Sequence, residues 1–251
     1  MIVSSTEIQN NFGKYLVLSV KEDIIITKNG FEIAKLTFIE GRATKSFLED
    51  SMVGEQATGY NYGGKKATYE EFLELTKDNE DRYEYIDGEI YLLSSPQTVH
   101  QVVLTELFGI FYNWFQGKKC KPMLAPYDIT LKRHPEDKNV VQPDIMVICD
   151  LEEKLNDNDY YMGVPALVVE IISKSTRSKD FVKKLDLYMY CGIKEYWIVN
   201  PISREVFIFA LSDGNITDNK AYKLKDTAES FIFEGLAVEL EKIFTTPAID
   251  K

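Results

Sequence analysis

Two carboxylates, Asp144 and Glu170, each accompany an apolar segment. Glu170 interrupts the run at residues 166–172, which is typical of a strand buried on both faces, and Asp144 follows Pro143 at the head of a second apolar strand. A buried lone carboxylate is costly unless it is paired, protonated or bound to a metal. If the two strands are neighbours, the carboxylates meet and need a cation between them. Oxygen ligands of this kind suit Mg²⁺ or Mn²⁺.

Each carboxylate also has a plainer interpretation. An Asp after Pro143 is common in turns, and Glu170 is also compatible with the solvent end of a strand, where it would cap a loop. The coincidence of two such strands, 26 positions apart, favours the metal site over two independent structural roles.

A lysine that could complete the chemistry lies on the next expected helix, at about residues 180–190. Asp180, Lys184 and Tyr188 are spaced four residues apart, so they share one helical face. In one interpretation Asp180 and Lys184 form a surface pair that contributes ~0.3–0.5 kcal/mol. In the other, Lys184 turns towards the two carboxylates.

Composition limits the class of protein. The chain has 251 residues, of which 45% are hydrophobic and 12% aromatic, so it can form a substantial core and is not disordered. Its net charge of -11 argues against a protein that coats DNA without specificity. Metal-binding carboxylates contribute to such a charge, so a nuclease remains compatible with it.

The cysteines and the N-terminus bear on location. Cys120, Cys149 and Cys191 have no zinc-binding spacing with each other or with the two histidines, and an odd number of scattered cysteines fits a reducing cytosol. The first residues do not resemble a signal peptide, and no apolar stretch approaches the roughly 18 residues of a membrane span. We therefore expect a soluble cytoplasmic protein that does not contact a membrane.

The pattern along the chain predicts three parts. Residues 1–40 predict a small α+β module: a capped helix from Ser4 to about Val20, then a hairpin with its turn at Asn29-Gly30. Residues 41–67 are rich in glycine and poor in apolar positions, which indicates a linker. Residues 68–247 predict an α/β domain, a mixed sheet flanked by helices. Its expected elements are a capped helix from Thr68, a hairpin at 83–93, a long helix at 98–115, strands near 121–132, 144–149, 166–172 and 195–199, and a strand pair near 205–211 and 221–225.

Two parts of the chain resemble known families. Residues 1–40, with the hairpin IITKNGFEIAKL, resemble the N-terminal half of prevent-host-death antitoxins, which implies a module that dimerises and binds DNA. Residues 68–245 resemble the Uma-two family of restriction-endonuclease-like proteins. The resemblance rests on YEYIDGEI, SPQTVH, QPD, the segment VEIISKST followed by Asp180 and Lys184, and EYWIVNP.

The second resemblance implies a PD-(D/E)xK nuclease site. Pro143-Asp144 would supply the "PD" and Glu170 the second acid, with the main-chain carbonyl of Ile171 as a further metal ligand. The lysine usually found two residues after the second acid is Ile172 here, and the resemblance favours Lys184 in its place.

Two further site residues come from the same resemblance. Glu84 matches an acidic position near the metal, and its alternative is a paired hairpin residue. His100 matches a recurrent histidine at the start of the long helix, where it is either a structural donor or a neighbour of the metal.

These observations leave three functions open. The first is a Mg²⁺- or Mn²⁺-dependent endonuclease that cleaves DNA as a homodimer and uses no small-molecule organic cofactor. The second is a DNA-binding regulator of antitoxin type that keeps an inert nuclease fold. The third is a structural interaction protein, which two acids on two apolar strands make the weakest of the three.

Overall fold

The computed structural model describes residues 1–4, 8, 15, 23–28, 31–37, 64–173, 176 and 179–245. Contacts divide the chain into two units, Met1–Lys65 and Lys66–Lys251. Most of the expected linker lies outside the described residues, as do residues 246–251.

The first unit contains three strands: β1 (Ile2–Ser4), β2 (Ile24–Lys28) and β3 (Phe31–Leu36). β1 runs parallel to β2, which pairs antiparallel with β3, so the predicted hairpin is confirmed. Its turn at Asn29-Gly30 and most of the expected helix lie outside the described residues. Ile8 and Tyr15, both from that helix segment, are buried together with Val3 and Ile24.

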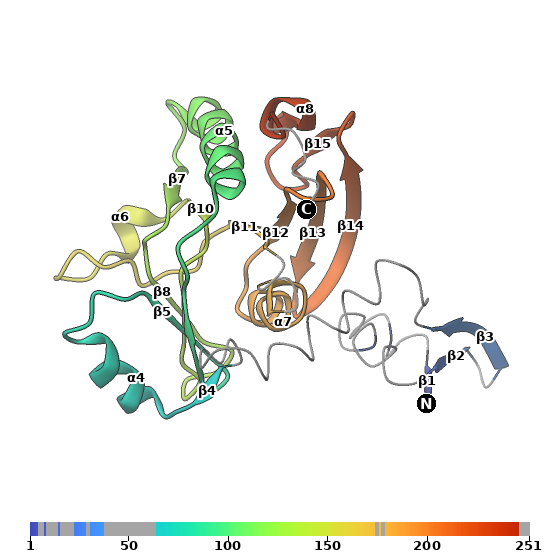
Figure 1. Ribbon diagram of the computed structural model, residues 1–251, viewed down its shortest axis with the longest axis horizontal. Coiled ribbons are helices and arrows are strands. Elements are labelled where there is room, and N and C mark those ends of the chain that lie inside the picture. Colours follow the sequence, from blue (N-terminus) through green and yellow to red (C-terminus); the bar gives the residue numbers. More distant parts are fainter. Residues whose placement is uncertain are drawn as a thin grey trace. The chain divides into compact units, whose positions relative to one another are not determined.

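The second unit is built on a six-stranded sheet. Its strands in spatial order are β14 (Asn215–Lys223), β13 (Glu205–Ser212), β12 (Glu195–Asn200), β11 (Leu167–Ile171), β10 (Ile145–Ile148) and β7 (Lys121–Leu124). β11 and β12 are parallel, and the other neighbours are antiparallel. The mixed sheet expected from the sequence is therefore confirmed (Figure 1).

Two smaller sheets belong to the same unit. The five-stranded sheet has the order β4 (Lys65–Lys66), β6 (Glu89–Leu92), β5 (Tyr83–Ile86), β9 (Asn139–Val141) and β8 (Ile129–Leu131). A two-stranded sheet pairs β15 (Thr227–Glu229) with β16 (Ala237–Glu239). Lys65 and Lys66 were expected in the linker, but they form a strand at the sheet edge, where the Ala67 amide donates to the carbonyl of Gly88.

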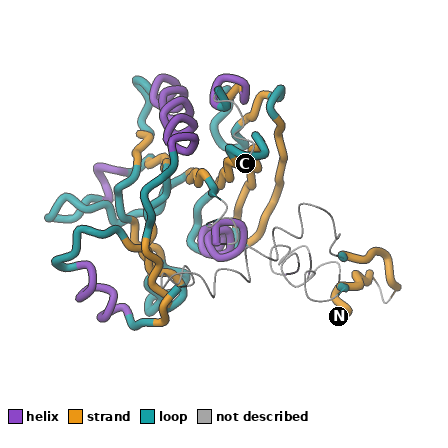
Figure 2. The backbone as a smooth tube through the Cα atoms, in the orientation of Figure 1, coloured by secondary structure: helices purple, strands orange, loops and turns teal. Residues whose placement is uncertain are grey.

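The helices of this unit are α4 (Tyr69–Thr76), α5 (Thr98–Phe115), α6 (Leu151–Lys154), the π-helix η1 (Lys179–Lys184), α7 (Leu185–Tyr190) and α8 (Leu240–Ile243). α4 begins with the predicted capping box, in which Thr68 and Glu71 bond each other's backbone amide. α5 has the predicted bounds, and Gly117 just beyond it adopts a φ of 72° that favours glycine. Figure 2 shows these helices among a larger amount of strand and loop.

Alternating side chains of the central strands supply two cores. Val147 and Val169 pack against α5, in a cluster that includes Leu107. Met146 and Val168 pack on the opposite face against α7. Because helices cover both faces, the central strands are apolar throughout, which explains the unbroken hydrophobic runs in the sequence.

Several expectations need correction. The single strand expected near 121–132 is divided between two sheets, as β7 and β8. The last strand begins at Asn215 rather than near residue 221, because it pairs with the full length of β13. The expected regular helix at 180–190 begins as the π-helix η1. Short elements without strong periodicity, such as β9, α6, α8, β15 and β16, were not anticipated.

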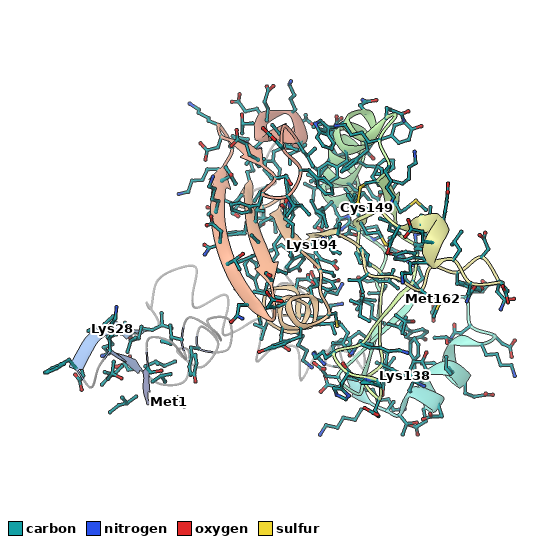
Figure 3. All side chains as sticks on the ribbon, turned by 180° about the vertical axis from the view of Figure 1, so that it is seen from behind. Met1, Lys28, Lys138, Cys149, Met162 and Lys194 are labelled. Carbon is teal, nitrogen blue, oxygen red and sulfur yellow. A yellow bond between two sulfur atoms is a disulfide. The ribbon has the colours of Figure 1, made fainter. Side chains whose placement is uncertain are left out.

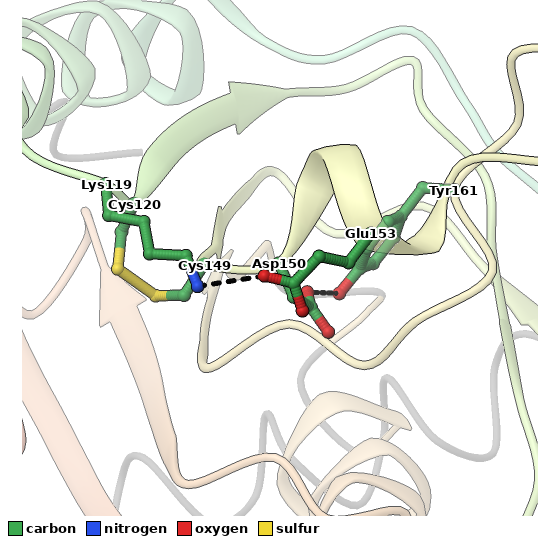
Figure 4. Close-up of a disulfide and its surroundings, with 6 residues drawn as sticks. All are labelled: Lys119, Cys120, Cys149, Asp150, Glu153 and Tyr161. Carbon is green, nitrogen blue, oxygen red and sulfur yellow. Dashed lines mark hydrogen bonds and ion pairs between the residues drawn. A yellow bond between two sulfur atoms is a disulfide. The ribbon is translucent and has the colours of Figure 1, made fainter.

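Cys120 and Cys149 form a disulfide, which differs from the expectation of scattered reduced cysteines (Figure 4). The cause is the antiparallel pairing of β7 with β10, in which Lys121 lies opposite Ile148. Cys191 is buried and free. Figure 3 labels Cys149 among the side chains seen from behind. Within the described residues, no helix combines the length and the apolar character needed to cross a membrane.

Candidate active site

The sheet register brings Asp144 and Glu170 to one face. Ile145 lies opposite Val169 in the antiparallel pair β10–β11, so Asp144, immediately before β10, continues the ladder towards Glu170. Glu170 shares a face of the strand with Val168 and Ile172, which lie two residues before and after it and pack on the α7 side of the sheet. Both acids therefore belong to the face that is covered by η1 and α7, as expected for neighbouring strands.

Lys184 lies between two carboxylates from different sheets. Its Nζ is 2.7 Å from Oε1 of Glu170 and 2.7 Å from Oε1 of Glu84. Asp180 Oδ1 is 3.8 Å from the same amine. All four side chains are buried, with exposed fractions of 7% or less. Asp180 and Lys184 thus form no surface pair, and Lys184 faces the two glutamates.

The π-helix contributes to this arrangement. A π-helical turn is wider than an α-helical turn and is commonly found at functional sites. η1 carries both Asp180 and Lys184 on its buried side, and Phe181 packs edge-on against Phe207 with ring centroids 5.4 Å apart. Where η1 passes into α7, Tyr188 donates a hydrogen bond of 2.7 Å to Glu170 Oε1.

Glu84 is more enclosed than the hairpin position suggested. It lies in β5 opposite Tyr91 and is fully buried. Its Oε1 accepts from the Gln142 amide at 3.1 Å, and its Oε2 accepts from Lys179 Nζ at 2.6 Å. Burial alone would raise the pKa of Glu84, but Lys184 and Lys179 lower that pKa to about 2. Glu84 is therefore ionised and holds two lysines.

Glu170 has the opposite electrostatic balance. Burial raises the pKa of Glu170 to about 8, and the negative charges of Asp180, Asp144 and Glu84 act in the same direction against Lys184. Burial would lower the pKa of Lys184, but the surrounding carboxylates raise that pKa overall, so the amine stays charged. We call Glu84, Asp144, Glu170 and Asp180 the acid cluster. It contains more carboxyl groups than the amines of Lys179 and Lys184 can balance, which is an environment that a cation would stabilise.

Asp144 is fixed by two contacts on one oxygen. Its Oδ2 accepts from the Ile171 amide at 2.7 Å and lies 3.2 Å from His100 Nε2. His100, in the first turn of α5, is partly buried, and within the described part of the chain its Nδ1 is buried without a hydrogen-bond partner. The structure thus brings His100 to Asp144 rather than leaving it as an isolated helix-start residue.

The donor set suits a hard divalent cation. The sequence-based ligand set consists of Asp144, Glu170 and the carbonyl of Ile171, all oxygen donors. Mg²⁺ is usually bound by one or two carboxylates and completes its coordination with water and substrate phosphate. In the described ranges, no three His, Cys, Asp or Glu side chains converge in the manner of a fully protein-bound metal.

Sequence reasoning placed Tyr188 and Asp180 on the Lys184 face but gave them no role, and it missed Lys179. A charged residue just before a predicted buried face was the available signal for Lys179. A surface cavity of about 330 Å³ lies elsewhere, and none of its lining residues belongs to the acid cluster: Tyr112, Phe115, Gln116, Lys121, Pro122, Met123 and Leu151.

Comparisons with known proteins identify the family of this chain and a related fold. The family Uma2, described as "Putative restriction endonuclease", matches residues 69–241. An uncharacterised protein of Synechocystis sp. (strain ATCC 27184 / PCC 6803 / Kazusa) is 27% identical over 183 residues, which cover 68% of this chain and 94% of that protein. A crystal structure from Anabaena variabilis, titled as a "putative nuclease belonging to DUF820", has a TM-score of 0.56 and 19% identity, covering 70% of this chain and 96% of that one. This last likeness concerns the fold. The antitoxin resemblance of residues 1–40 finds no support in these comparisons.

Proposed function

Because this chain belongs to the Uma2 family, we propose that it is a divalent-metal-dependent endonuclease that hydrolyses phosphodiester bonds of DNA. The observation that carries the proposal is the contact of Lys184 with Glu170, on the face of the sheet that also bears Asp144. A lysine and two acids from these positions are the groups that such hydrolysis requires. The lysine comes from η1 instead of the strand, where Ile172 occupies the usual position.

Each residue has a proposed task. Asp144, Glu170 and the carbonyl of Ile171 would hold Mg²⁺ or Mn²⁺, which when bound lowers the pKa of a coordinated water and offsets charge on the phosphate. Lys184 orients the attacking water and stabilises negative charge as it develops on the phosphate oxygens. His100 fixes the orientation of Asp144 through the contact at Oδ2.

Glu84 is proposed to act indirectly, through Lys184. Because its Oε1 and Oε2 are occupied by Lys184 and Lys179, it sets the position of the Lys184 amine. Tyr188 and Lys184 both bind Oε1 of Glu170. Within the described residues, Oε2 of Glu170 has no hydrogen-bond partner, so that oxygen is the one available to a cation.

The test is cleavage of supercoiled plasmid with Mg²⁺ or Mn²⁺. We expect Asp144→Ala, Glu170→Ala and Lys184→Ala each to reduce the rate at least ~100-fold, because each removes charge stabilisation worth several kcal/mol in the transition state. Lys242→Ala, which removes an exposed lysine on α8, is the matched control and should cleave like the wild type. Wild-type protein that leaves a panel of DNA and RNA substrates intact would contradict the proposal.

A regulator with an inert nuclease fold is the second candidate. The observation that favours it is that the Lys184 ammonium already lies between Glu84 and Glu170, 2.7 Å from each. A cation at Glu170 must coexist with that ammonium. Sequence-specific DNA binding that needs no metal, together with the absence of cleavage, would select this candidate over the first.

Dimerisation through residues 1–40 is also proposed. β3 lies at the edge of the small sheet and exposes Phe31 (75%) and Ile33 (55%), and exposed apolar side chains on an edge strand favour association. Ile33→Asp in the full chain should convert a dimer into a monomer in light scattering. An unchanged mass would remove this part of the proposal.

A further inference from the structure

We propose that Lys179, Lys183 and Tyr91 form a docking surface for the phosphodiester backbone of nucleic acid, next to the acid cluster. We call these three residues the lysine–tyrosine surface. The proposal deepens the proposed function by naming where the polymer would lie beside the site, and it rests on that function for the site itself.

The two lysines flank one aromatic ring. Lys179 Nζ lies 5.3 Å and Lys183 Nζ lies 5.2 Å from the centroid of Tyr91, which projects from β6 towards η1. Lys183 Nζ is also 2.5 Å from the Tyr91 hydroxyl. The Lys183 side chain is 36% exposed and the Lys179 side chain 13%, so part of each side chain faces solvent, while the amine of Lys183 pairs with Glu89 and that of Lys179 with Glu84. Lysines interleaved with an aromatic ring are typical of surfaces that hold a nucleic-acid strand.

One shared carboxylate connects this surface to the candidate active site. Glu84 binds Lys179 through Oε2 and Lys184 through Oε1. The same carboxylate therefore contacts both Lys179 and Lys184, the lysine that we propose acts on the scissile phosphate. A strand with one phosphate at Lys184 would place a flanking phosphate near Lys179 and Lys183.

The charge of the whole chain favours a local group of lysines as the place where nucleic acid would be held. With a net charge of -11, most of the protein repels a polyanion. η1 concentrates lysine, with the sequence KDFVKK over its six residues. Lys66 adds positive charge nearby. Burial raises the pKa of Glu89, but hydrogen bonds from Lys183 and Tyr91 lower it overall, and the charge of Lys66 makes a smaller contribution in the same direction. An ammonium has three donor hydrogens, so a lysine that binds one carboxylate can still bind a phosphate.

The experiment measures binding separately from cleavage. Full-length protein is titrated in EDTA into a short labelled DNA duplex, its single strand and the matching RNA, and fluorescence anisotropy is recorded at several salt concentrations. The double variant Lys179→Ala/Lys183→Ala should weaken binding at least ~10-fold at low salt. It should also reduce the slope of log affinity against log salt by about 1.8 for a duplex or about 1.4 for a single strand, because two phosphate contacts are lost.

Two further variants keep the test decisive. Lys183→Ala alone leaves the fully buried Glu84 untouched and breaks only partly exposed contacts, with Glu89 and Tyr91. It should therefore fold normally and lose about half of the slope change. Lys242→Ala also breaks a lysine–glutamate pair, because Lys242 on α8 lies 2.7 Å from Glu239 at the end of β16, and this variant should bind like the wild type. Tyr91→Leu should weaken single-strand binding more than Tyr91→Phe, since the phenyl ring still stacks on a base.

The outcomes separate this inference from the proposed function. Unchanged affinity and slope in both lysine variants, or an equal loss in Lys242→Ala, would overturn the docking surface even if the protein cleaves DNA. Lost binding in the lysine variants of a protein that cleaves nothing would support the surface and remove the nuclease. A loss confined to RNA would keep the surface and change the polymer.

Discussion

Lys184 and Glu84 are in direct contact, with 2.7 Å between Nζ and Oε1, although they come from different layers of the second unit. Glu84 belongs to the five-stranded sheet, and Lys184 belongs to η1 beside the six-stranded sheet. The contact joins two parts of the fold through a buried ion pair. Because of this contact, the position of the Lys184 amine depends on Glu84, which is far away in the sequence.

Removal of Lys184 should therefore destabilise the protein. Lys184→Ala leaves Glu84 and Glu170 buried without their ammonium, and breaking a buried pair in this way typically costs ~3–5 kcal/mol. Urea unfolding followed by circular dichroism measures the loss. Lys242→Ala, from an exposed pair with Glu239, should cost at most ~1 kcal/mol. Similar losses in the two variants would show that the buried contact has no special weight.

Tyr188 should affect both stability and metal use. Tyr188→Phe removes the donor to Glu170 Oε1 and should cost ~1–3 kcal/mol, because the hydroxyl and its acceptor are buried. If Glu170 holds the cation, the variant should also need more Mn²⁺ for half-maximal cleavage, since the carboxylate is less firmly oriented. Tyr190→Phe is the control, because Tyr190 is 48% exposed. An unchanged Mn²⁺ requirement would remove Tyr188 from the site.

The sequence was informative where structure depends on local periodicity. The apolar runs around Asp144 and Glu170 predicted β10 and β11, and the register then explains why the two acids share a face. The capping box at Thr68 and the helix at Thr98–Phe115 were predictable for the same reason, because their signals lie within a few residues of the element.

Long-range pairing limited the rest. Glu84 could be linked to the site only by family resemblance, since its contact with Lys184 depends on how the two sheets pack. A regular helix was the natural expectation for residues 180–190, and no local pattern indicated the π-helical turn that carries the buried Asp180 and Lys184. The pairing of Cys120 with Cys149 required the β7–β10 register, which no local pattern encodes.

Stability should depend on pH through Glu170 and Glu84 in opposite directions. Burial raises the pKa of Glu170 to about 8, so its contribution is fully present below about pH 4.5 and is lost as the pH rises towards 8. Lysines lower the pKa of Glu84 to about 2, so its contribution is present above about pH 4.5 and is lost as the pH falls towards 2. In EDTA, the free energy of unfolding should therefore decline between about pH 5 and pH 8.

Substitution of Glu170 tests the cause of that decline. Glu170→Gln removes the titrating group, so urea unfolding across this pH range should give a flatter profile than the wild type. Glu239→Gln, an exposed glutamate on β16, should keep the wild-type slope. A wild-type slope in Glu170→Gln would assign the decline to another group, with Asp180 the next candidate because burial raises its pKa.

The disulfide gives a prediction that bears on the compartment inferred from the sequence. Cys120 and Cys149 close a loop with a sequence separation of 29, and a cross-link of that length stabilises by about 3–4 kcal/mol in the chain-entropy account. Cys149→Ser should lose this stability without reductant and match the wild type when both are reduced. Thiol titration of the denatured wild type should find Cys191 alone before reduction and all three cysteines after it. Three reactive thiols without reductant, in protein prepared from cytosol, would show that the pair is reduced there and would restore the original expectation of free cysteines.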